Sequence, residues 1–351
     1  MTINLAASAW EIEGGGFLRR AWYPAGFAQE LESGLLARRI LNLPVLLYRD
    51  QGGQVVAISN RCPHRFAPLS LGRLEGGVVH CGYHGLGFDR SGRCVHNPHG
   101  SVAAVQALSI ATFPLRERYG LLWIWMGEPD QVDEALLPVY DKLDPEAFFI
   151  RTGYLHGQAH YELMVDNIMD LSHIEFLHPA LGTDSVSKAK VEVTQENGQV
   201  ITTRRMRDEI LRPGLAYIYQ TGTLKVDRSM EVSWQAPANM VLNVNIQPHE
   251  PSLPPRGSQT LHLFTPETVH TTHYFYVSSL SKATASETLC DDFIAALGKA
   301  FVNEDKKMID AQQIMLGHED IMRMKPGLLP IDKAPILVRR YLQKMIVQET
   351  A

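Results

Sequence analysis

Residues 61–92, RCPHRFAPLSLGRLEGGVVHCGYHGLGFDRSG, contain two cysteine–histidine pairs that indicate how the first part of the chain folds. One residue separates Cys62 from His64, sixteen residues follow, and two residues separate Cys81 from His84. Glycines surround both pairs, and glycine allows the tight turns and close backbone approach that two loops need to grip one group. The stretch therefore predicts two ligand-bearing loops at the tips of short hairpins.

The order of these four residues bears on which metal site they form. Two cysteines and two histidines can bind zinc, but zinc fingers usually place both cysteines before both histidines. Here the order is Cys, His, Cys, His, with one of each on each loop. A Rieske [2Fe–2S] cluster has two cysteines on one iron and two histidines on the other. The order favours this cluster over zinc and predicts a one-electron carrier.

Short β-type segments separated by turn residues surround the two loops. Because such segments with Gly, Asp and Asn turns are typical of small all-β folds, we expect residues 1–130 to form one all-β domain. A Rieske electron carrier needs only about one hundred residues, so the rest of the 351-residue chain requires another explanation. The segments are PVLLYRD (44–50), VVAISN (55–60), GGVVHC (76–81) and GLLWIWMG (120–127).

Residues 131–351 show a mixed pattern. A helical segment (160–177) precedes alternating, strand-like segments, and a long helical stretch follows from about Ser286 to His318. Strands followed by a long helix predict an α+β domain in which an antiparallel sheet wraps a helix. The strand-like segments are 191–206, with a turn at Asn197–Gly198, then 240–246 and 273–279.

The segment NIMDLSHIEFLHP (167–179) is apolar and helix-like, yet it carries an aspartate and two histidines. Burying such groups costs free energy unless they have a partner such as a metal. His173 and His178 lie five residues apart, about 140° around an ideal helix, so they share a face only if the helix is distorted or ends. Pro179 supports a helix end there. Asp170 and His173, three apart, share a face.

A third ligand is expected from the long helix, because two imidazoles with one carboxylate and open positions suit non-haem Fe(II). Leu297, Phe301, Asp305 and Met308 form an apolar stripe with one acid in it. Glu304 instead lies three residues before Lys307 and is expected to form an exposed ion pair. Asp310 falls off the stripe. Helix geometry thus favours Asp305 without excluding the neighbouring acids.

The segments CPHRFAPLSLG (62–72) and CGYHGLGFD (81–89) closely resemble the cluster-binding loops of Rieske non-haem iron oxygenases. The closest likeness is to the single-subunit type typified by vanillate and dicamba O-demethylase oxygenase components, and it extends from AWYPAG (21–26) to the C-terminal helix. The resemblance implies a Rieske domain (1–130) and a helix-grip, START-like catalytic domain (131–351). It also implies a [2Fe–2S] cluster on Cys62, His64, Cys81 and His84.

In this family an N-x-x-D-x-x-H-x-x-x-x-H motif pairs with a late aspartate, and Asn167, Asp170, His173 and His178 match the motif. The resemblance implies that both histidines and Asp305 bind mononuclear Fe(II). It further implies that Asp170 links His173 to His84 of a neighbouring subunit, so the protein is expected to be a homotrimer. Asn167 is expected to lie near the iron without being a strong ligand.

The same resemblance implies a terminal oxygenase that hydroxylates a small, aromatic substrate with O₂, most naturally as an oxidative O- or N-demethylation. Ring hydroxylation, and an electron carrier without its own catalysis, are the alternatives. No dinucleotide-binding or phosphate-binding glycine loop occurs in the chain, so electrons are expected from a separate NAD(P)H-dependent reductase, with or without a ferredoxin.

Composition excludes some partners. The net charge of −5 and the lack of a long basic tract argue against nucleic acid. The longest apolar run, residues 120–127, is too short to span a bilayer. The first sixteen residues lack the features of a signal peptide, so a cytoplasmic protein is expected.

The remaining polar groups give weaker signals. Asn243 and His273 lie on strand-like segments and are candidate substrate contacts, although half-exposed sheet faces give the same pattern. Cys94 and Cys290 are expected to be ordinary buried thiols. Nothing in the sequence decides the role of Glu175.

Overall fold

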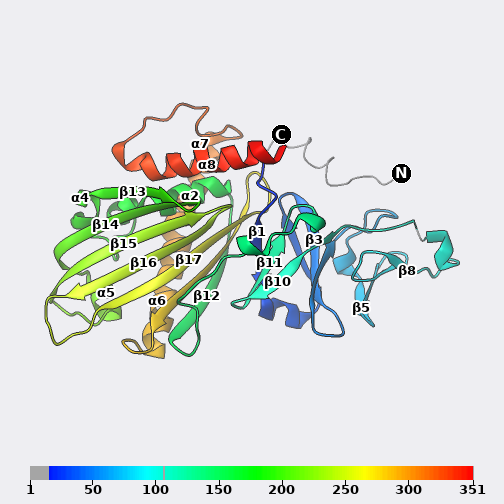
Figure 1. The fold of residues 1–351 in the computed structure, drawn as a ribbon, viewed down its shortest axis with the longest axis horizontal. Helices are drawn as coiled ribbons and strands as arrows, with labels where there is room; N and C mark the ends of the chain where they lie inside the picture. Colours follow the sequence, from blue (N-terminus) through cyan, green and yellow to red (C-terminus); the bar gives the residue numbers. More distant parts are fainter. Residues whose placement is uncertain (1–15, 106, 351) are drawn as a thin grey trace. The chain divides into compact units, whose positions relative to one another are not determined.

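The computed structural model describes residues 16–105 and 107–350 (Figure 1). The segment on which the absence of a signal peptide was predicted lies almost entirely outside these residues. The described chain forms two compact units, which divide after Leu137. The first unit also includes residues 265–269 and the C-terminal end from Glu349. In the described part of the chain, no helix is long and apolar enough to cross a membrane.

The first unit is all-β, as the sequence predicts. It contains three small antiparallel sheets with the strand orders β1-β11-β10, β2-β3-β4-β9 and β5-β6-β7-β8. The Cys81 loop connects β6 and β7 of the third sheet, whereas the Cys62 loop follows β4 of the second sheet. The strands are β1 (Trp22–Phe27), β2 (Leu36–Ile40), β3 (Leu43–Arg49), β4 (Val55–Ser59), β5 (Arg73–Glu75), β6 (Val78–His80), β7 (Gly87–Phe88), β8 (Cys94–His96), β9 (Thr112–Phe113), β10 (Leu115–Arg118) and β11 (Leu121–Trp125).

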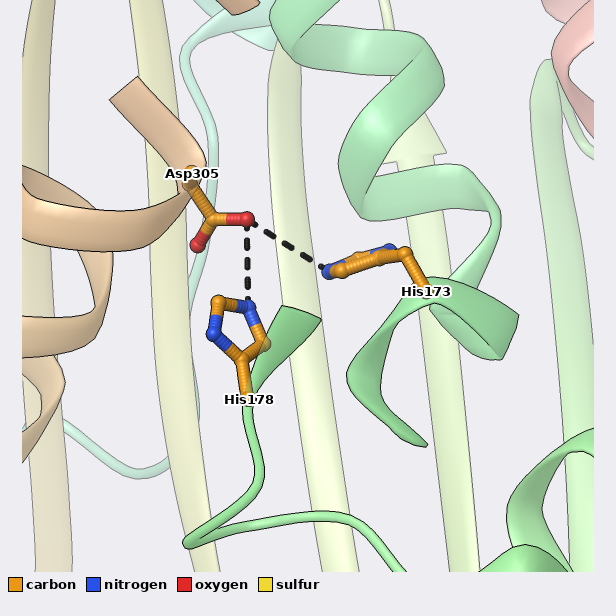
Figure 2. A group of neighbouring side chains, drawn as sticks. All are labelled: His173, His178 and Asp305. Carbon is orange, nitrogen blue, oxygen red and sulfur yellow. Dashed lines mark ion pairs between the residues drawn. The ribbon is translucent and has the colours of Figure 1, made fainter. Parts of the chain in front are cut away.

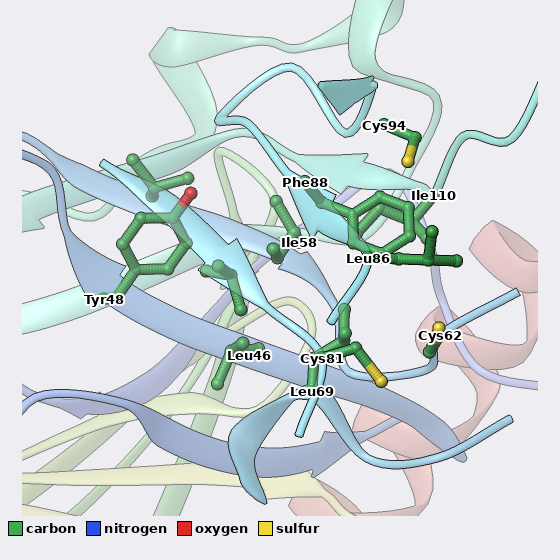
Figure 3. Packing of buried hydrophobic residues seen from close by; sticks show 12 residues of the cluster. Leu46, Tyr48, Ile58, Cys62, Leu69, Cys81, Leu86, Phe88, Cys94 and Ile110 are labelled. Carbon is green, nitrogen blue, oxygen red and sulfur yellow. The ribbon is translucent and has the colours of Figure 1, made fainter. Parts of the chain in front are cut away.

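A hydrophobic cluster packs against the cysteines of the two loops. Leu46, Ile58, Leu69 and Phe88 are fully buried, and they pack with Cys62 and Cys81 in one cluster. Figure 3 shows both cysteines at the edge of this cluster. The apolar strands therefore fix the positions from which the loops project. Short 3₁₀ turns lie between the strands of this unit and after its last strand: η1 (Ala28–Ser33), η2 (Leu69–Leu71), η3 (Val102–Val105), η4 (Pro129–Gln131) and η5 (Glu134–Leu136).

The second unit is built on a seven-stranded antiparallel sheet with the order β12-β18-β17-β16-β15-β14-β13. Its hairpin at Asn197–Gly198 has positive φ at both residues, which is the turn that this dipeptide predicts. Figure 1 shows the strongly curved sheet. The strands are β12 (Phe148–Gly157), β13 (Val191–Glu196), β14 (Gln199–Ile210), β15 (Lys225–Gln235), β16 (Asn239–Pro248), β17 (Arg256–Pro266) and β18 (Thr272–Ser281).

A long helix packs across this sheet and confirms the predicted α+β class. Leu289, Cys290 and Phe293 on α6 form a buried cluster with sheet residues Val226 and Ile246. Figure 1 shows α6 lying across the sheet. The helices are α2 (Tyr161–Met169), α3 (Ile174–Leu177), α4 (Asp184–Lys188), α5 (Pro213–Ile218), α6 (Glu287–Ala300), α7 (Lys306–Leu316) and α8 (Lys333–Thr350), with 3₁₀ turns η6 (Leu171–His173) and η8 (Pro330–Asp332).

Candidate functional site

The two cysteine–histidine loops are copies of one turn. The N–H of each cysteine donates to the carbonyl five residues later, Cys62 to Ala67 and Cys81 to Leu86, at 2.9 and 2.8 Å. The carbonyl of each cysteine accepts from the residue four positions on, which is Phe66 or Gly85. Both of these residues have positive φ, +58° and +74°, a conformation that costs less at glycine than at phenylalanine. The two loops therefore present their cysteines in the same way.

The turn brings together the four residues that the sequence singles out here. The rings of His64 and His84 have centroids 4.6 Å apart, and both cysteines are 2% exposed. Burial, together with the neighbouring Cys81, raises the pKa of the Cys62 thiol to about 11. A cation bound to the sulfurs reverses this effect, because metals bind the thiolate. His99, on the adjacent turn, lies with Nε2 3.0 Å from the His84 carbonyl oxygen.

In the second unit, the helical segment predicted over 160–177 is interrupted. Helix α2 ends at Met169, where Asp170 adopts an extended conformation and caps the following 3₁₀ turn through its side chain. After α3 the backbone leaves the helix at His178 (φ −119°, ψ 74°), just before Pro179. The predicted distortion between the two histidines is therefore present. The break at Asp170 adds a second change of direction.

The long helix contains an irregularity that the sequence does not signal. Residues Phe301–Asp305 form a π-turn between α6 and α7. One extra residue per turn shifts the buried stripe, so Ile309 is buried whereas Met308, predicted on the stripe, is 56% exposed. The π-turn also brings two neighbouring acids to one histidine. Glu304 contacts Nδ1 of His178 at 2.5 Å, so the expected exposed ion pair of Glu304 with Lys307 is wrong.

His173, His178 and Asp305 converge at this point (Figure 2), and one donor atom from each lies within 4.8 Å of the others. Oδ1 of Asp305 is 3.1 Å from Nε2 of His178 and 3.6 Å from Nε2 of His173. Ligand atoms about 2.1 Å from a shared ion at right angles are about 3 Å apart. Both His178 and Asp305 are buried. The geometry fits a single metal ion held by three residues.

Hydrogen bonds at Nδ1 orient both imidazoles. Nδ1 of His173 lies 2.6 Å from the carbonyl oxygen of Asp170, and Nδ1 of His178 faces Glu304. Both Nε2 atoms are thereby turned toward Asp305. Burial lowers the pKa of His173, against the opposing charge of Asp305. Burial also disfavours charged His178, but its bonds to Asp305 and Glu304 raise the pKa above its usual value.

Asp170 and Asn167 lie beside this group without joining it. Nδ2 of Asn167 donates to Oδ1 of Asp305 at 3.1 Å, which places Asn167 near the centre, as expected. The carboxylate of Asp170 accepts from Ser172 and from Arg204, whose side chain is 3% exposed. Within the single chain, His173 is bound by the carbonyl of Asp170 and not by its carboxylate.

A cavity of about 90 Å³ opens beside the three residues. That volume holds about six to nine water-sized groups, the size of a small substituted ring. Its walls are mainly apolar, as ligand cavities usually are. The lining residues include His173, His178, Asp305, Ile168, Leu242, Val244, Thr260, Leu297 and Phe301. A more open cleft of about 950 Å³ involves Glu175 and Phe176, but none of the three.

His262 is a cavity residue that the sequence analysis missed. It is 1% exposed, its Nδ1 lies 2.6 Å from the Tyr274 hydroxyl, and its Nε2 is buried without a hydrogen-bond partner. Burial lowers its pKa to about 3, so the imidazole is neutral. A single histidine in the apolar strand segment LHLF (261–264) looks like a core residue in sequence. The structure also places Glu175, whose role the sequence leaves undecided. This residue is partly buried, and its Oε2 has no hydrogen-bond partner.

The two candidate substrate residues lie outside the cavity lining. On β16, Leu242 and Val244 line the cavity, so the alternating Asn243 points to the opposite face, where it accepts from Lys142 and Gln259. His273 pairs through Nδ1 with the Tyr154 hydroxyl at 2.9 Å. Asn243 therefore lies on the other face of β16 from the cavity, and no residue of β18 is among those that line it.

Comparisons with known proteins identify this arrangement. Residues 21–114 match the Rieske [2Fe-2S] domain, and residues 157–348 match the vanillate O-demethylase oxygenase C-terminal domain. The dicamba O-demethylase oxygenase component of Stenotrophomonas maltophilia is 34% identical over 95% of this chain and 99% of that protein. The chain belongs to the vanillate O-demethylase family of Rieske oxygenases.

Further similarities cover nearly all of this Rieske oxygenase. The chloroacetanilide N-alkylformylase oxygenase component of Rhizorhabdus wittichii is 34% identical over 95% of the chain and 97% of that protein. A crystal structure of dicamba monooxygenase bound to 3,6-dichlorosalicylic acid superposes with a TM-score of 0.89 at 34% identity, covering 96% of this chain and all of that one. The chain is therefore the oxygenase component of a Rieske monooxygenase system, and such components receive electrons from a separate reductase or ferredoxin.

Proposed function

We propose that this oxygenase removes a methyl group from a small aromatic substrate by O₂-dependent hydroxylation, as an O- or N-demethylase. The observation that carries the proposal is the group of two histidines and one aspartate on the wall of an apolar, ring-sized cavity. The relatives named for dicamba O-demethylation and chloroacetanilide N-dealkylation support removal of a substituent over ring hydroxylation. Ring hydroxylation remains the alternative product of the same site.

The donor chemistry supports two assignments. Cys62, Cys81, His64 and His84 supply the two thiolates and two imidazoles of a Rieske cluster. His173, His178 and Asp305 supply the two imidazoles and one carboxylate that suit Fe(II) with open coordination positions. We assign residues 1–130 to the cluster domain and 131–351 to the catalytic domain.

Iron held by these three residues would activate O₂ for insertion of one oxygen atom into a substrate C–H bond. The chain's own groups prepare that chemistry. Glu304 and the Asp170 carbonyl hold the imidazole rings through Nδ1. A metal-bound histidine needs such a partner at its other ring nitrogen to fix the orientation of the ring. The apolar walls exclude bulk water and place the substrate beside the three residues. A hydroxylated methoxy or N-methyl carbon is then lost as formaldehyde.

The proposal includes an assembly. Phe66, Leu71 and Tyr83, near the two cluster loops, are 62–79% exposed, which is unusual for large apolar side chains in such proximity. Contact with another protein surface would bury these side chains and so explain their exposure in the single chain. We propose a homotrimer in which Asp170 of one chain bonds to His84 of the next, and a separate NAD(P)H-dependent reductase that docks nearby. No disulfide joins the four cysteines, which supports a cytoplasmic location. A role in aromatic catabolism follows from the proposed substrate class.

Two measurements test the function together. With a surrogate reductase, formaldehyde release is measured across methoxyaromatic and N-methyl compounds, and ring-hydroxylated products are measured in parallel. Iron is counted in the same preparation. A demethylase releases formaldehyde and holds about three irons per chain, whereas an electron carrier without catalysis holds about two. Ring-hydroxylated product without formaldehyde, or two irons per chain, contradicts the proposal.

A further inference from the structure

The cavity has a second polar end, formed by Arg228, Tyr219 and Ser258. Arg228 lies on β15 between Val226 and Met230, and all three are buried on the face of the sheet that meets the cavity. Arg228 is 3% exposed. Tyr219 is buried beside it, with its hydroxyl 2.8 Å from that of Ser258. An apolar wall therefore contains a cationic side chain between two apolar residues on the same face of the strand.

The hydrogen bonds of Arg228 are incomplete. Its Nη2 donates to Oε1 of Glu209 at 2.7 Å, and its Nε is buried without a partner. Glu209 is 5% exposed and is held from the other side by the hydroxyls of Thr183 and Ser185, which bond to the same oxygen. A guanidinium has five N–H donors, and leaving one of them buried and unpaired costs free energy. Glu209 thus anchors Arg228 without satisfying it.

The position of this pair relative to the three metal-site residues follows from strand geometry. Ser258, Thr260 and His262 alternate along β17, and all three line the cavity. Ser258 and His262 are four residues apart, which corresponds to about 13 Å along a strand. His262 lies in the electrostatic field of Asp305, whereas Arg228 acts on Tyr219. The cationic end and the metal end therefore lie at different ends of the cavity, with room for a substituted ring between them.

We propose that Arg228 is a specificity-determining residue that binds the carboxylate of an aromatic substrate, with the reacting methyl group at the opposite end of the ring. This inference rests on the proposed demethylase function. A planar guanidinium held at Nη2 presents its remaining edge to a carboxylate, and such paired contacts fix orientation as well as charge. The separation of the two ends favours acids whose methoxy group is meta or para to the carboxylate over ortho isomers.

A purely structural ion pair is the competing explanation. A buried ion pair adds little stability over apolar residues of the same size, so stability alone gives no reason for a cation on a cavity wall. The two explanations differ in what they predict for ligands. A structural pair affects neutral and anionic ligands equally, whereas an anion-binding arginine discriminates between them.

The test measures binding apart from turnover. Equilibrium dialysis of the anaerobic, iron-loaded enzyme compares 4-methoxybenzoate with the neutral 4-methoxybenzamide and with 2-methoxybenzoate. The double variant R228Q/E209Q removes both buried charges together, so neither is left unpaired. We expect its Kd for 4-methoxybenzoate to rise about 10- to 150-fold, with the amide unchanged. E209Q, which retains Arg228, keeps or tightens the binding of the benzoate.

R207Q is the matched control, because Arg207 lies on β14 close to Glu209 but is exposed and paired with Asp227. It should leave all three dissociation constants unchanged. Equal weakening of benzoate and amide in the double variant, or no change in either, overturns the role of Arg228, as does preferred binding of the ortho isomer. If the charge discrimination holds but no compound yields formaldehyde, the anion site stands and the demethylase function fails.

Discussion

The two candidate metal sites of this oxygenase are built in opposite ways. In the first unit, Cys62 and Cys81 occupy the same position in two copies of one turn, and every ligand lies within three residues of a cysteine. In the second unit, His178 and Asp305 are far apart in sequence and meet only because one helix is broken and another contains a π-turn. A site made of local turns is encoded by spacing. A site made of helix irregularities depends on packing between elements.

The first prediction separates the two sites most strongly. Replacing Asp305 by alanine removes the only carboxylate among the three converging residues. We expect loss of the mononuclear iron and of all turnover, because two imidazoles alone bind iron weakly. The visible and EPR spectra of the Rieske cluster should be unchanged, since its ligands belong to a different unit. Iron content and formaldehyde release measure the outcome.

Asp310 offers a matched control five residues along the same helical stretch. Its carboxylate accepts from the backbone N–H of Gln158 and pairs with Lys306, so it does not face the centre. D310A should retain its iron. The converse variant, C81A, should lose the Rieske spectrum. Full turnover in D305A would refute the ligand assignment.

The second prediction concerns the residue proposed to connect the two sites. Asp170→Asn keeps the side-chain shape and an acceptor oxygen for the N–H of Ser172, but it removes the charge. We expect both metal centres to stay loaded while turnover falls about 100-fold. Single-turnover kinetics with a chemically reduced cluster would show that the electron transfer step is slowed.

Asp170 also pairs with buried Arg204, so a structural loss must be distinguished from a loss of electron transfer. The double variant D170N/R204M leaves no unpaired charge. If it recovers both stability and turnover, Asp170 serves the fold and the bridging role is wrong. If stability returns while turnover stays low, the bridging role is supported.

How much the sequence predicts follows the same division. The four cysteine and histidine positions, the strands around them and the sheet-and-helix class all follow from spacing and alternation. The pair His173 and His178 even predicts its own helix distortion. The sequence does not signal the π-turn, since FVNED contains no proline or glycine. For that reason the predicted positions of Met308 and Glu304 are wrong. Asn243 and His273 lie outside the cavity lining, because polarity alone does not show which face or which strand meets a cavity.

The third prediction concerns Glu304, whose contact with His178 the sequence does not predict. Glu304 is available to His178 only because the π-turn brings two consecutive acids to one ring, one at each nitrogen. Glu304→Leu should weaken iron binding about 10- to 100-fold by freeing the ring to rotate. Glu304→Gln, which retains an acceptor oxygen, should have a smaller effect. Iron retained after dialysis against a chelator is the measurement, with the Rieske spectrum unchanged.

Lys307 provides the control for Glu304. It is exposed, and an ion pair between Glu304 and Lys307 is the arrangement that helix spacing alone suggests. K307Q should leave iron retention unchanged. Equal iron loss in K307Q and E304L would show that surface charge, and not the bond to His178, governs the site.

The smallest effect is expected at the start of α2, the helix that precedes the break at Asp170. Burial and nearby Arg339 lower the pKa of His160 to about 4, and the unfolded chain titrates near 6.5. Between these values the unfolded state binds more protons, so stability is full above about pH 6.5 and is lost as the pH falls toward 4. At pH 5 this residue should lower the free energy of unfolding by about 2 kcal/mol.

His160→Asn keeps the side-chain cap on the N–H of Glu162 and removes that loss. In denaturant unfolding, the variant should be as stable as the wild type at pH 7.5 and more stable at pH 5. Equal pH dependence in both proteins would show that His160 is protonated in the folded state. A gain confined to the second unit, with the Rieske absorbance unaffected, would show that acid loosens the packing-dependent site before the turn-encoded one.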